Sequence, residues 1–132
     1  MTVDHRPMAV VGVGAVAGVG EDELSGLVAA VLVEAGLAVG DVRALATLDR
    51  KATEPAIVGL ARRRGWELLT FSAADLAAIT VPSPSAGVRE VTGTPSVAEA
   101  AALAGAGTHE LIVGKRRSAG ATAAVAKVCG TF

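Results

Sequence analysis

Segments typical of buried strands alternate along this chain with segments of helical spacing, and this alternation limits the possible folds more than any other feature. Residues 8–14 (MAVVGVG) form a continuous apolar run of the kind found in strands that are buried on both faces. Four further strands are predicted at residues 42–48, 66–71, 110–114 and 122–128. Because strands that alternate with helices favour a mostly parallel sheet, we predict an α/β fold. It has three α/β/α layers and a mostly parallel, possibly mixed, sheet of about five strands.

The helices are predicted from their end signals. Three acidic residues, 21–23, open a helix that runs to a C-cap at Gly36. Pro55 begins a second helix that ends at Gly65. Ser72 with Asp75 is typical of a cap for a short helix to residue 79. The last predicted helix begins at Ser96, with Glu99 completing a capping box, and ends at residue 105. Residues 80–95 are predicted to be mostly loop, with room for a short strand at 88–91.

Length and composition favour one domain with a core of small side chains. The chain has 132 residues, and 52% hydrophobic against 19% charged residues excludes intrinsic disorder. Alanine and valine supply most of the apolar content, while Trp, Tyr and Phe together number three. We predict a single domain over residues 1–132, with residues 1–7 as a mobile N-terminus.

Several functional classes are excluded by the same composition. A net charge of -1, with no tyrosine, argues against nucleic-acid binding. The apolar run of residues 8–20 is shorter than the ~20 residues that a membrane span needs, and its glycines and mixed-charge flank make a signal peptide a poor alternative. One cysteine permits no internal disulfide, so we expect a cytoplasmic protein. Neither a metal site nor a cofactor is predicted, since no Cys/His cluster has zinc spacing.

Polar and glycine-rich segments follow four of the predicted strands. They are residues 14–23, 49–55, 72–75 and 114–120. In open α/β sheets, ligands bind beside the carboxyl ends of the strands. We therefore expect these segments to meet at one edge of the sheet and to form the functional site there.

Gly12 and Gly14 belong to a loose G-x-G-x-x-G/A pattern after the first strand. In dinucleotide-binding proteins this pattern brings backbone N–H groups close to a pyrophosphate. The acidic partner expected about 20 residues later is missing, because Asp49 lies too far along the chain. A glycine-rich turn with a structural role, or a cradle for another anion, therefore remains an alternative to nucleotide binding.

Residues 49–54 (DRKATE) place four charges where a strand leads into a helix. Lys51 or Arg50 could hold a carboxylate, with Asp49 or Glu54 as proton acceptor or hydrogen-bond partner. A solvated loop, in which Glu54 favours the helix dipole, explains the same residues equally well.

Two other segments could receive an acidic ligand. Gly93, Thr94 and Ser96 precede a predicted helix, whose first N–H groups can bind an acid group, although a capping box alone is the simpler interpretation. Lys115 and Arg116 lie in a predicted basic turn, a feature that is more often solvated than ligand-binding. The histidines and Cys129 form no recognisable catalytic triad, and Cys129 is expected to be a small core residue.

Five motifs occur in one order along the chain: GVGAVAG (12–18), LATLDRKATEP (45–55), GWELLTFSAADL (65–76), TGTPSVAEAAAL (92–103) and GKRRSAGATAAVA (114–126). Together they resemble the CobE/CbiG C-terminal family of cobalamin biosynthesis proteins, over about residues 8–128. The second motif and GTPSVAEAAAL (93–103) are the most specific. In CbiG proteins this module ends a longer chain that opens a lactone ring on a cobalt-precorrin and releases acetaldehyde. The resemblance implies the stand-alone CobE type, which is associated with corrin-ring synthesis in the aerobic route.

The resemblance also implies a ligand and a set of residues. The ligand would be an acidic tetrapyrrole or corrinoid intermediate, and other enzymes of the cobalamin pathway are possible partners. The family commonly carries one or two arginines after the first G-x-G, where this chain has Val16 and Ala17. If those arginines hold ligand carboxylates, this chain either binds the ligand more weakly or relies on Lys51, Lys115 and Arg116 instead. The matching positions are Gly12, Gly14, Asp49, Lys51, Glu54, Gly93, Thr94, Ser96, Glu99 and Lys115.

The chemistry of such a ligand agrees with these residues. A corrin precursor carries acetate and propionate arms around an apolar ring, so its site needs spaced cations and helix N-termini around small side chains. If the protein is catalytic, Lys51 would orient a carboxylate and Asp49 or Glu54 would transfer the proton. The alternatives are a non-catalytic carrier or partner of a pathway enzyme, and a small nucleotide-binding module.

Overall fold

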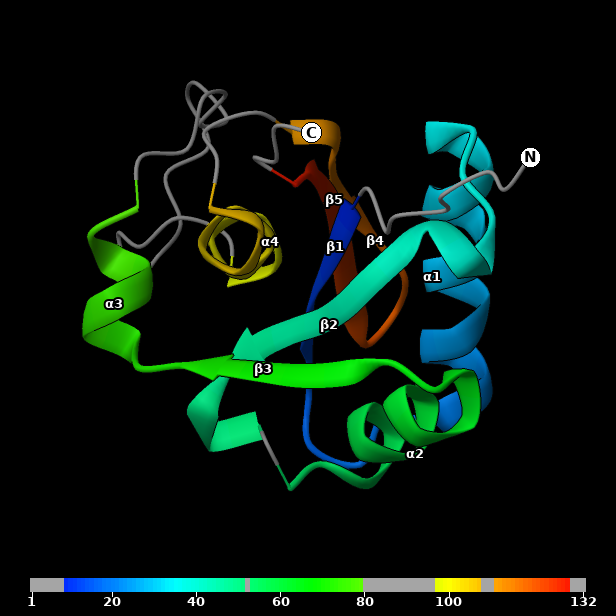
Figure 1. Ribbon diagram of the computed structural model, residues 1–132. Coiled ribbons are helices and arrows are strands. Elements are labelled where there is room, and N and C mark those ends of the chain that lie inside the picture. Colours follow the sequence, from blue (N-terminus) through cyan, green and yellow to red (C-terminus); the bar gives the residue numbers. More distant parts are fainter. Residues whose placement is uncertain (1–8, 52, 80–96, 108–110, 129–132) are drawn as a thin grey trace.

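A five-stranded sheet forms the centre of the protein (Figure 1). The structure is a computed structural model, and it describes residues 9–51, 53–79, 97–107 and 111–128. The strands lie in the order β3-β2-β1-β5-β4. Their bounds are β1 Ala9–Ala15, β2 Val42–Leu48, β3 Glu67–Phe71, β4 Leu111–Arg117 and β5 Ala121–Lys127.

The sheet is mixed, and one strand alone runs against the others. β1, β2 and β3 pair in parallel. β5 is antiparallel to both of its neighbours, β1 and β4, so β4 has the same direction as β1. The carboxyl ends of β1, β2, β3 and β4 therefore lie at one edge, which we call the C-terminal edge. This arrangement confirms the predicted α/β class and the sheet of five strands, which is of the mixed kind that the prediction allowed.

Helices cover both faces of the sheet. α1 (Glu21–Ala35) and α2 (Pro55–Arg64) pack together on one face, whereas α3 (Ala73–Ala77) and α4 (Val97–Ala106) lie on the other (Figure 1). Two 3₁₀ turns, η1 (Val39–Asp41) and η2 (Asp49–Lys51), precede and follow β2. The three α/β/α layers predicted from the strand–helix alternation are present.

The two faces of the sheet have cores of different character. Under α1 and α2 the core contains large side chains such as Leu24, Leu45, Ile57 and Leu60, all at most 1% exposed. Under α4 it consists mainly of alanine, from the helix itself and from β2 and β5. Small side chains let this helix approach the sheet closely. A Cβ atom on Gly12 of β1 would lie 2.0 Å from the carbonyl oxygen of Ala98 and 2.5 Å from the backbone nitrogen of Ala102.

The predicted bounds of β2 and the glycine caps of α1 and α2 are confirmed, whereas most other element ends differ from the prediction by one to three residues. β2 spans the predicted residues, and α1 and α2 end at Gly36 and Gly65, both at φ 74°. This left-handed conformation costs a glycine little, so glycine is the preferred cap. The cap of α3 is a reciprocal capping box, in which the Asp75 N–H donates to Ser72 Oγ at 3.0 Å and the Ser72 N–H donates to Asp75 Oδ2 at 3.3 Å.

The predicted basic turn at residues 115–117 is wrong. These residues form the end of β4, and the turn to β5 is residues 118–120, closed by the N–H of Ser118 and the carbonyl of Ala121 at 2.9 Å. β4 is an edge strand, where exposed charged side chains are tolerated and protect the open edge from pairing. The possible strand at 88–91, the segment Gly93–Ser96, His109 and Cys129 lie outside the described residues.

Over the residues that the structure describes, no helix is long and apolar enough to cross a membrane. Among the same residues, no group of three or more His, Cys, Asp or Glu side chains could hold a metal ion.

Candidate functional site at the C-terminal edge

The loops that follow β1 and β2 are bonded to each other at the C-terminal edge. The N–H of Gly18, in the β1–α1 loop (residues 16–20), donates to Glu54 Oε2 at 3.1 Å. Glu54 follows η2 and is the N-cap residue of α2. The turn after β4 joins the same group, because the N–H of Val16 donates to the carbonyl of Gly120 at 2.9 Å. Segments far apart in sequence thus meet at one edge, as the topology predicted.

The β1–α1 loop is held by bonds within the protein. Besides the bonds of Val16 and Gly18, the N–H of Val19 donates to the carbonyl of Val16 at 3.2 Å. Three amides of the glycine-rich loop are therefore already used, and the acidic residues 21–23 open the helix that follows. A pyrophosphate needs free N–H groups and a favourable dipole at such a helix start. Few N–H groups of this loop stay available and the first turn of the helix is acidic, which argues against the nucleotide-binding alternative.

Glu23 ties α1 to the turn after β4. One of its carboxylate oxygens, Oε2, accepts bonds from Ser118 Oγ at 2.5 Å and from the N–H of Gly120 at 2.6 Å. These two bonds, the hydroxyl first, lower the pKa of the Glu23 carboxyl below its usual range. Sequence reasoning assigned Glu23 only to the helix dipole, because nothing local indicates a contact with residues almost a hundred positions later.

The predicted cation Lys51 lies at this edge, and no carboxylate of the described residues pairs with it. It ends η2 and is half-buried, whereas Asp49 and Arg50 are exposed. Within the described part of the chain, no ion pair or side-chain hydrogen bond involves any of these three residues. Lys51 belongs to the same turn as Glu54, since its carbonyl accepts the N–H of Glu54 at 3.0 Å.

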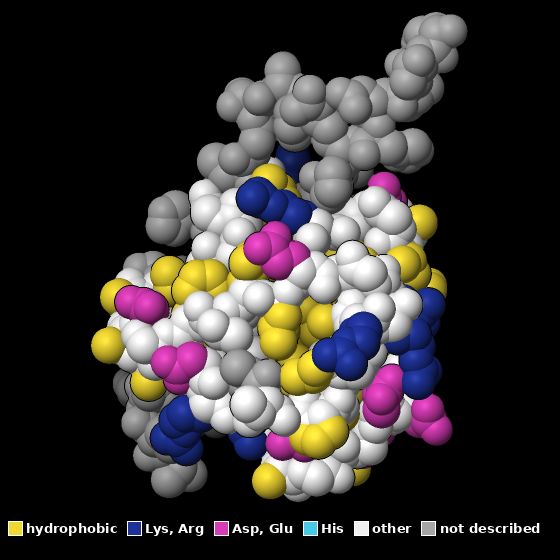
Figure 2. Space-filling model, turned by 60° about the horizontal axis from the view of Figure 1, so that its bottom comes forward, with side chains coloured by type: hydrophobic (Ala, Val, Ile, Leu, Met, Phe, Trp, Pro, Cys, Tyr) yellow, Lys and Arg dark blue, Asp and Glu magenta, His cyan; other side chains and the backbone are white. Residues whose placement is uncertain are grey.

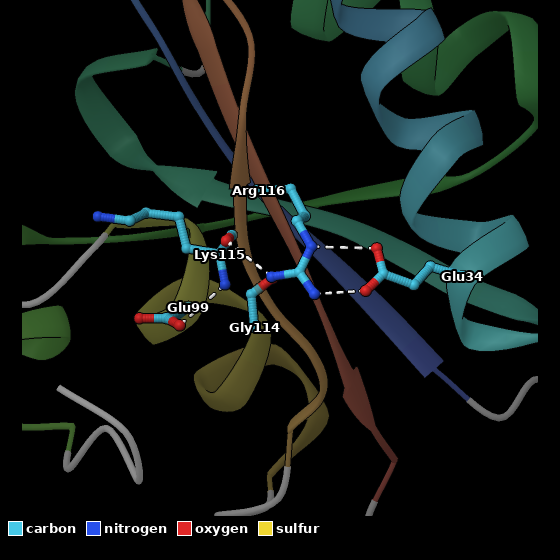
Figure 3. Close-up of polar contacts among 5 residues, drawn as sticks. All are labelled: Glu34, Glu99, Gly114, Lys115 and Arg116. Atoms are coloured by element: carbon cyan, nitrogen blue, oxygen red, sulfur yellow. Dashed lines mark hydrogen bonds and ion pairs between the residues drawn. The ribbon is translucent and has the colours of Figure 1, made fainter. Parts of the chain in front are cut away.

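Glu99 and Lys115 meet on the face that α4 covers (Figure 3). The Glu99 side chain is buried, with 8% of the residue exposed, and its Oε2 accepts the backbone N–H of Lys115 at 2.9 Å. The Lys115 side chain extends away from Arg116, toward the side of α4, as Figure 3 shows. The structure therefore brings two predicted ligand-binding residues into contact.

Arg116 points to the opposite face of the sheet. Its Nε donates to Glu34 Oε1 at 3.0 Å, and its NH2 group pairs with Oε2 of the same carboxylate near the end of α1. This two-point pair lowers the pKa of Glu34 and raises that of Arg116, chiefly through the hydrogen bonds. Arg116 is thus separated by the sheet from Lys115, so the two predicted cations do not form one site.

The two predicted glycines have different surroundings. Gly12 is buried beneath α4, and its lack of a side chain is explained by that packing. Gly14 lies nearer the edge, where a Cβ atom would come 2.8 Å from Thr122 Oγ1 and 3.6 Å from Val97 Cβ. α4 begins at Val97, so its N-terminus opens beside Gly14 at the C-terminal edge. Gly93, Thr94 and Ser96, predicted to bind ligand ahead of this helix, lie outside the described residues.

The surface at the bottom of Figure 1, where the loops after β1 and β2 lie, is brought forward in Figure 2. Basic and acidic side chains are interspersed there with hydrophobic ones. Val16, at the tip of the β1–α1 loop, is one of the exposed hydrophobic residues, at 59%. An acidic ligand would therefore be held by individually placed cations rather than by a broad basic patch.

Comparison with known proteins identifies the family. Residues 9–126 match the family model described as cobalamin synthesis G C-terminus. The chain belongs to this family. It is a cobalamin biosynthesis protein of the CobE/CbiG kind, as the sequence motifs indicated. It is 42% identical to Protein CobE of Sinorhizobium sp. over 124 residues, covering 87% of this chain and 80% of that protein.

A longer relative contains the module as one part. The chain is 30% identical over 125 residues to cobalt-precorrin-5A hydrolase of Priestia megaterium, covering 94% of this chain but only 33% of the hydrolase. Among solved structures, CobE of the cobalamin biosynthetic pathway has a TM-score of 0.80 at 32% identity, with 93% of this chain and 95% of that chain covered. Cobalamin biosynthesis protein ChiG of Agrobacterium tumefaciens has a TM-score of 0.72 at 28% identity, with 92% and 99% covered.

Proposed function

We propose that the C-terminal edge binds an acidic tetrapyrrole or corrinoid intermediate of cobalamin synthesis. The observation that carries the proposal is Lys51, a half-buried cation at an edge whose loops are already bonded to one another. Among the described residues, the Lys51 ammonium group has no ion pair or hydrogen bond, so a carboxylate of the ligand would give it a charged hydrogen-bond partner. The relative named cobalt-precorrin-5A hydrolase supports this class of ligand.

The chemistry of the ligand determines which residues contribute. Carboxylate arms need charged donors, which Lys51 provides on one side of the edge and Lys115 on the α4 side. The N-terminus of α4, beside Gly14, adds a favourable dipole at the same edge. Gly93, Thr94 and Ser96 remain part of the proposed site because they precede this helix. Gly12 and Arg116 do not, since one lies beneath α4 and the other pairs with Glu34.

A role in catalysis would fall to Asp49. It is exposed at the edge beside Lys51, whereas Glu54 already accepts the N–H of Gly18. A carboxylate that must take a proton from a ligand has to be accessible to it. The same site would also serve a carrier that holds the intermediate for another pathway enzyme. With one cysteine and therefore no internal disulfide, the protein suits the reducing cytoplasm, where we place this step.

The experiment that tests the proposal is a visible-absorbance titration with hydrogenobyrinic acid and its precorrin precursors, followed by mass analysis of the recovered ligand. A saturable spectral shift establishes binding. An altered mass then identifies an enzyme and its reaction, whereas an unchanged mass identifies a carrier. Absence of a shift with every compound, in protein whose circular dichroism shows a native fold, would contradict the proposal.

A further inference from the structure

Glu54 has an unusual hydrogen-bonding pattern for the residue that precedes a helix. Its backbone occupies the N-cap position of α2, yet its side chain makes no capping bond with that helix. The carboxylate instead reaches the β1–α1 loop, 36 positions earlier in the chain, where Oε2 accepts the N–H of Gly18 at 3.1 Å. Sequence reasoning treated Glu54 as a dipole-favouring or proton-transferring group, and neither role requires this contact.

We propose that Glu54 is a positioning residue, whose carboxylate fixes the β1–α1 loop against the turn that carries Lys51. The inference rests on the proposed function, because the shape of the C-terminal edge matters only if a ligand binds there.

The backbone conformation of Gly18 explains why the β1–α1 loop needs the hydrogen bond to Glu54. Gly18 has φ of 80°, a region that L side chains rarely adopt, and no heavy atom would lie within 4 Å of a Cβ atom there. Glycine loses more conformational freedom on folding than any other residue. A turn bond from the Val19 N–H to the Val16 carbonyl closes the loop on itself, and the bond from Gly18 to Glu54 ties it to the turn after β2.

The other anchors of the loop lie on either side of this bond. Val16 is held by the carbonyl of Gly120, and Val19 is buried at 9% exposure. The side chains of Val16 and Ala17 are nevertheless exposed at the edge. The Lys51 carbonyl accepts the N–H of Glu54 at 3.0 Å, so the same residue is bonded both to the Lys51 turn and to the loop. Loss of the Glu54 carboxylate would therefore break the link between the β1–α1 loop and the turn that carries Lys51.

Two other glutamates also accept a backbone N–H group from another segment. Glu23 accepts the N–H of Gly120, and Glu99 accepts the N–H of Lys115. Three glutamates thus each bond a backbone amide of a segment that is distant in sequence. Hydrogen bonds to a charged acceptor are about twice as strong as those between neutral groups, so these carboxylates are suited to fixing loops.

The test compares the variants Glu54→Gln and Glu54→Ala with the matched control Glu67→Ala. Glu67 is an exposed glutamate at the start of β3, away from the C-terminal edge. Glutamine keeps a carbonyl acceptor at the same reach, and alanine removes it. Two quantities are measured: the hydrogen-exchange rate of the Gly18 amide by NMR without ligand, and the affinity for hydrogenobyrinic acid. We expect Glu54→Ala to accelerate Gly18 exchange about tenfold and to weaken binding severalfold. Glu54→Gln should stay within about threefold of the unmodified protein in both, and Glu67→Ala should change neither.

Two results would overturn the inference. One is an unchanged Gly18 exchange rate in a folded Glu54→Ala variant. The other is loss of affinity in Glu54→Gln with slow Gly18 exchange, which would mean that the charge of Glu54 acts on the ligand itself. If the unmodified protein binds no corrinoid, the proposed function fails, and the exchange rates measured without ligand still decide whether Glu54 holds the loop.

Discussion

Substitution of Gly12 by alanine should destabilise the protein severely. The added Cβ atom would meet the backbone of α4, at 2.0 Å from the Ala98 oxygen and 2.5 Å from the Ala102 nitrogen. Backbone atoms cannot turn aside as the end of a flexible side chain can, so the helix would have to retreat from the sheet by at least about 1 Å. Its buried alanines and Leu103, which are 0–5% exposed, would then lose close contacts with β1, β2 and β5.

We expect a loss of about 3 kcal/mol in the free energy of unfolding, the upper end of the usual range for overpacking. For a chain of this size, that loss lowers the Tm by about 10 °C or prevents folding. The measurement is thermal and urea unfolding followed by circular dichroism.

The matched control is Gly26→Ala. Gly26 lies in the interior of α1, is exposed, and has no heavy atom within 4 Å of a Cβ position. The same substitution there should stabilise the protein by about 0.5–1 kcal/mol, because alanine is the better helix former. A Gly12→Ala variant whose Tm lies within about 2 °C of the unmodified protein would refute the packing argument.

Two further predictions concern the charged groups. The pKa of Glu23 is lowered in the folded protein by its bonds from Ser118 and Gly120, so its stabilising effect is present above the ordinary glutamate pKa and is lost as the pH falls through the folded value. The urea concentration at the midpoint of unfolding should therefore fall as the pH is lowered below about 4.5, and it should fall less steeply in Glu23→Gln. The same dependence of the midpoint on pH in both proteins would contradict this role of Glu23. Arg116→Ala should leave corrinoid affinity within about twofold of the unmodified protein, because its guanidinium is exposed, pairs with Glu34 and is separated by the sheet from Lys115. A loss of affinity like that expected for Lys51→Ala would place Arg116 in the site.

The sequence predicted those features of the fold that are encoded locally. β2 and the glycine caps of α1 and α2 depend on residues within or next to the element, and the structure confirms them. The apolar pattern of β5 does not indicate its direction, but the short connection of residues 118–120 does, because a parallel pair would need a crossover of a dozen or more residues. Residues 115–117 were assigned wrongly to a turn because their charges resemble a loop, although an edge strand accommodates them.

The candidate site was predicted only as a location. Convergence at one edge follows from topology, and Lys51 lies there as expected. The bonds from Glu54 to Gly18 and from Glu23 to Gly120 join segments 36 and 97 positions apart. No local pattern in a single sequence identifies such pairs. Likewise, the G-x-G pattern indicated a possible anion cradle, whereas the structure explains Gly12 by the close approach of α4.

The most direct test of the central claim compares Lys51→Ala with Arg43→Ala in titrations with hydrogenobyrinic acid. Both residues are cations on or next to β2, but Arg43 is exposed near the start of the strand, at the opposite edge. If the ligand binds at the C-terminal edge, Lys51→Ala should weaken binding by about tenfold, the value of one charged hydrogen bond, while Arg43→Ala should leave it unchanged. Equal affinity in the two folded variants would contradict binding at this edge.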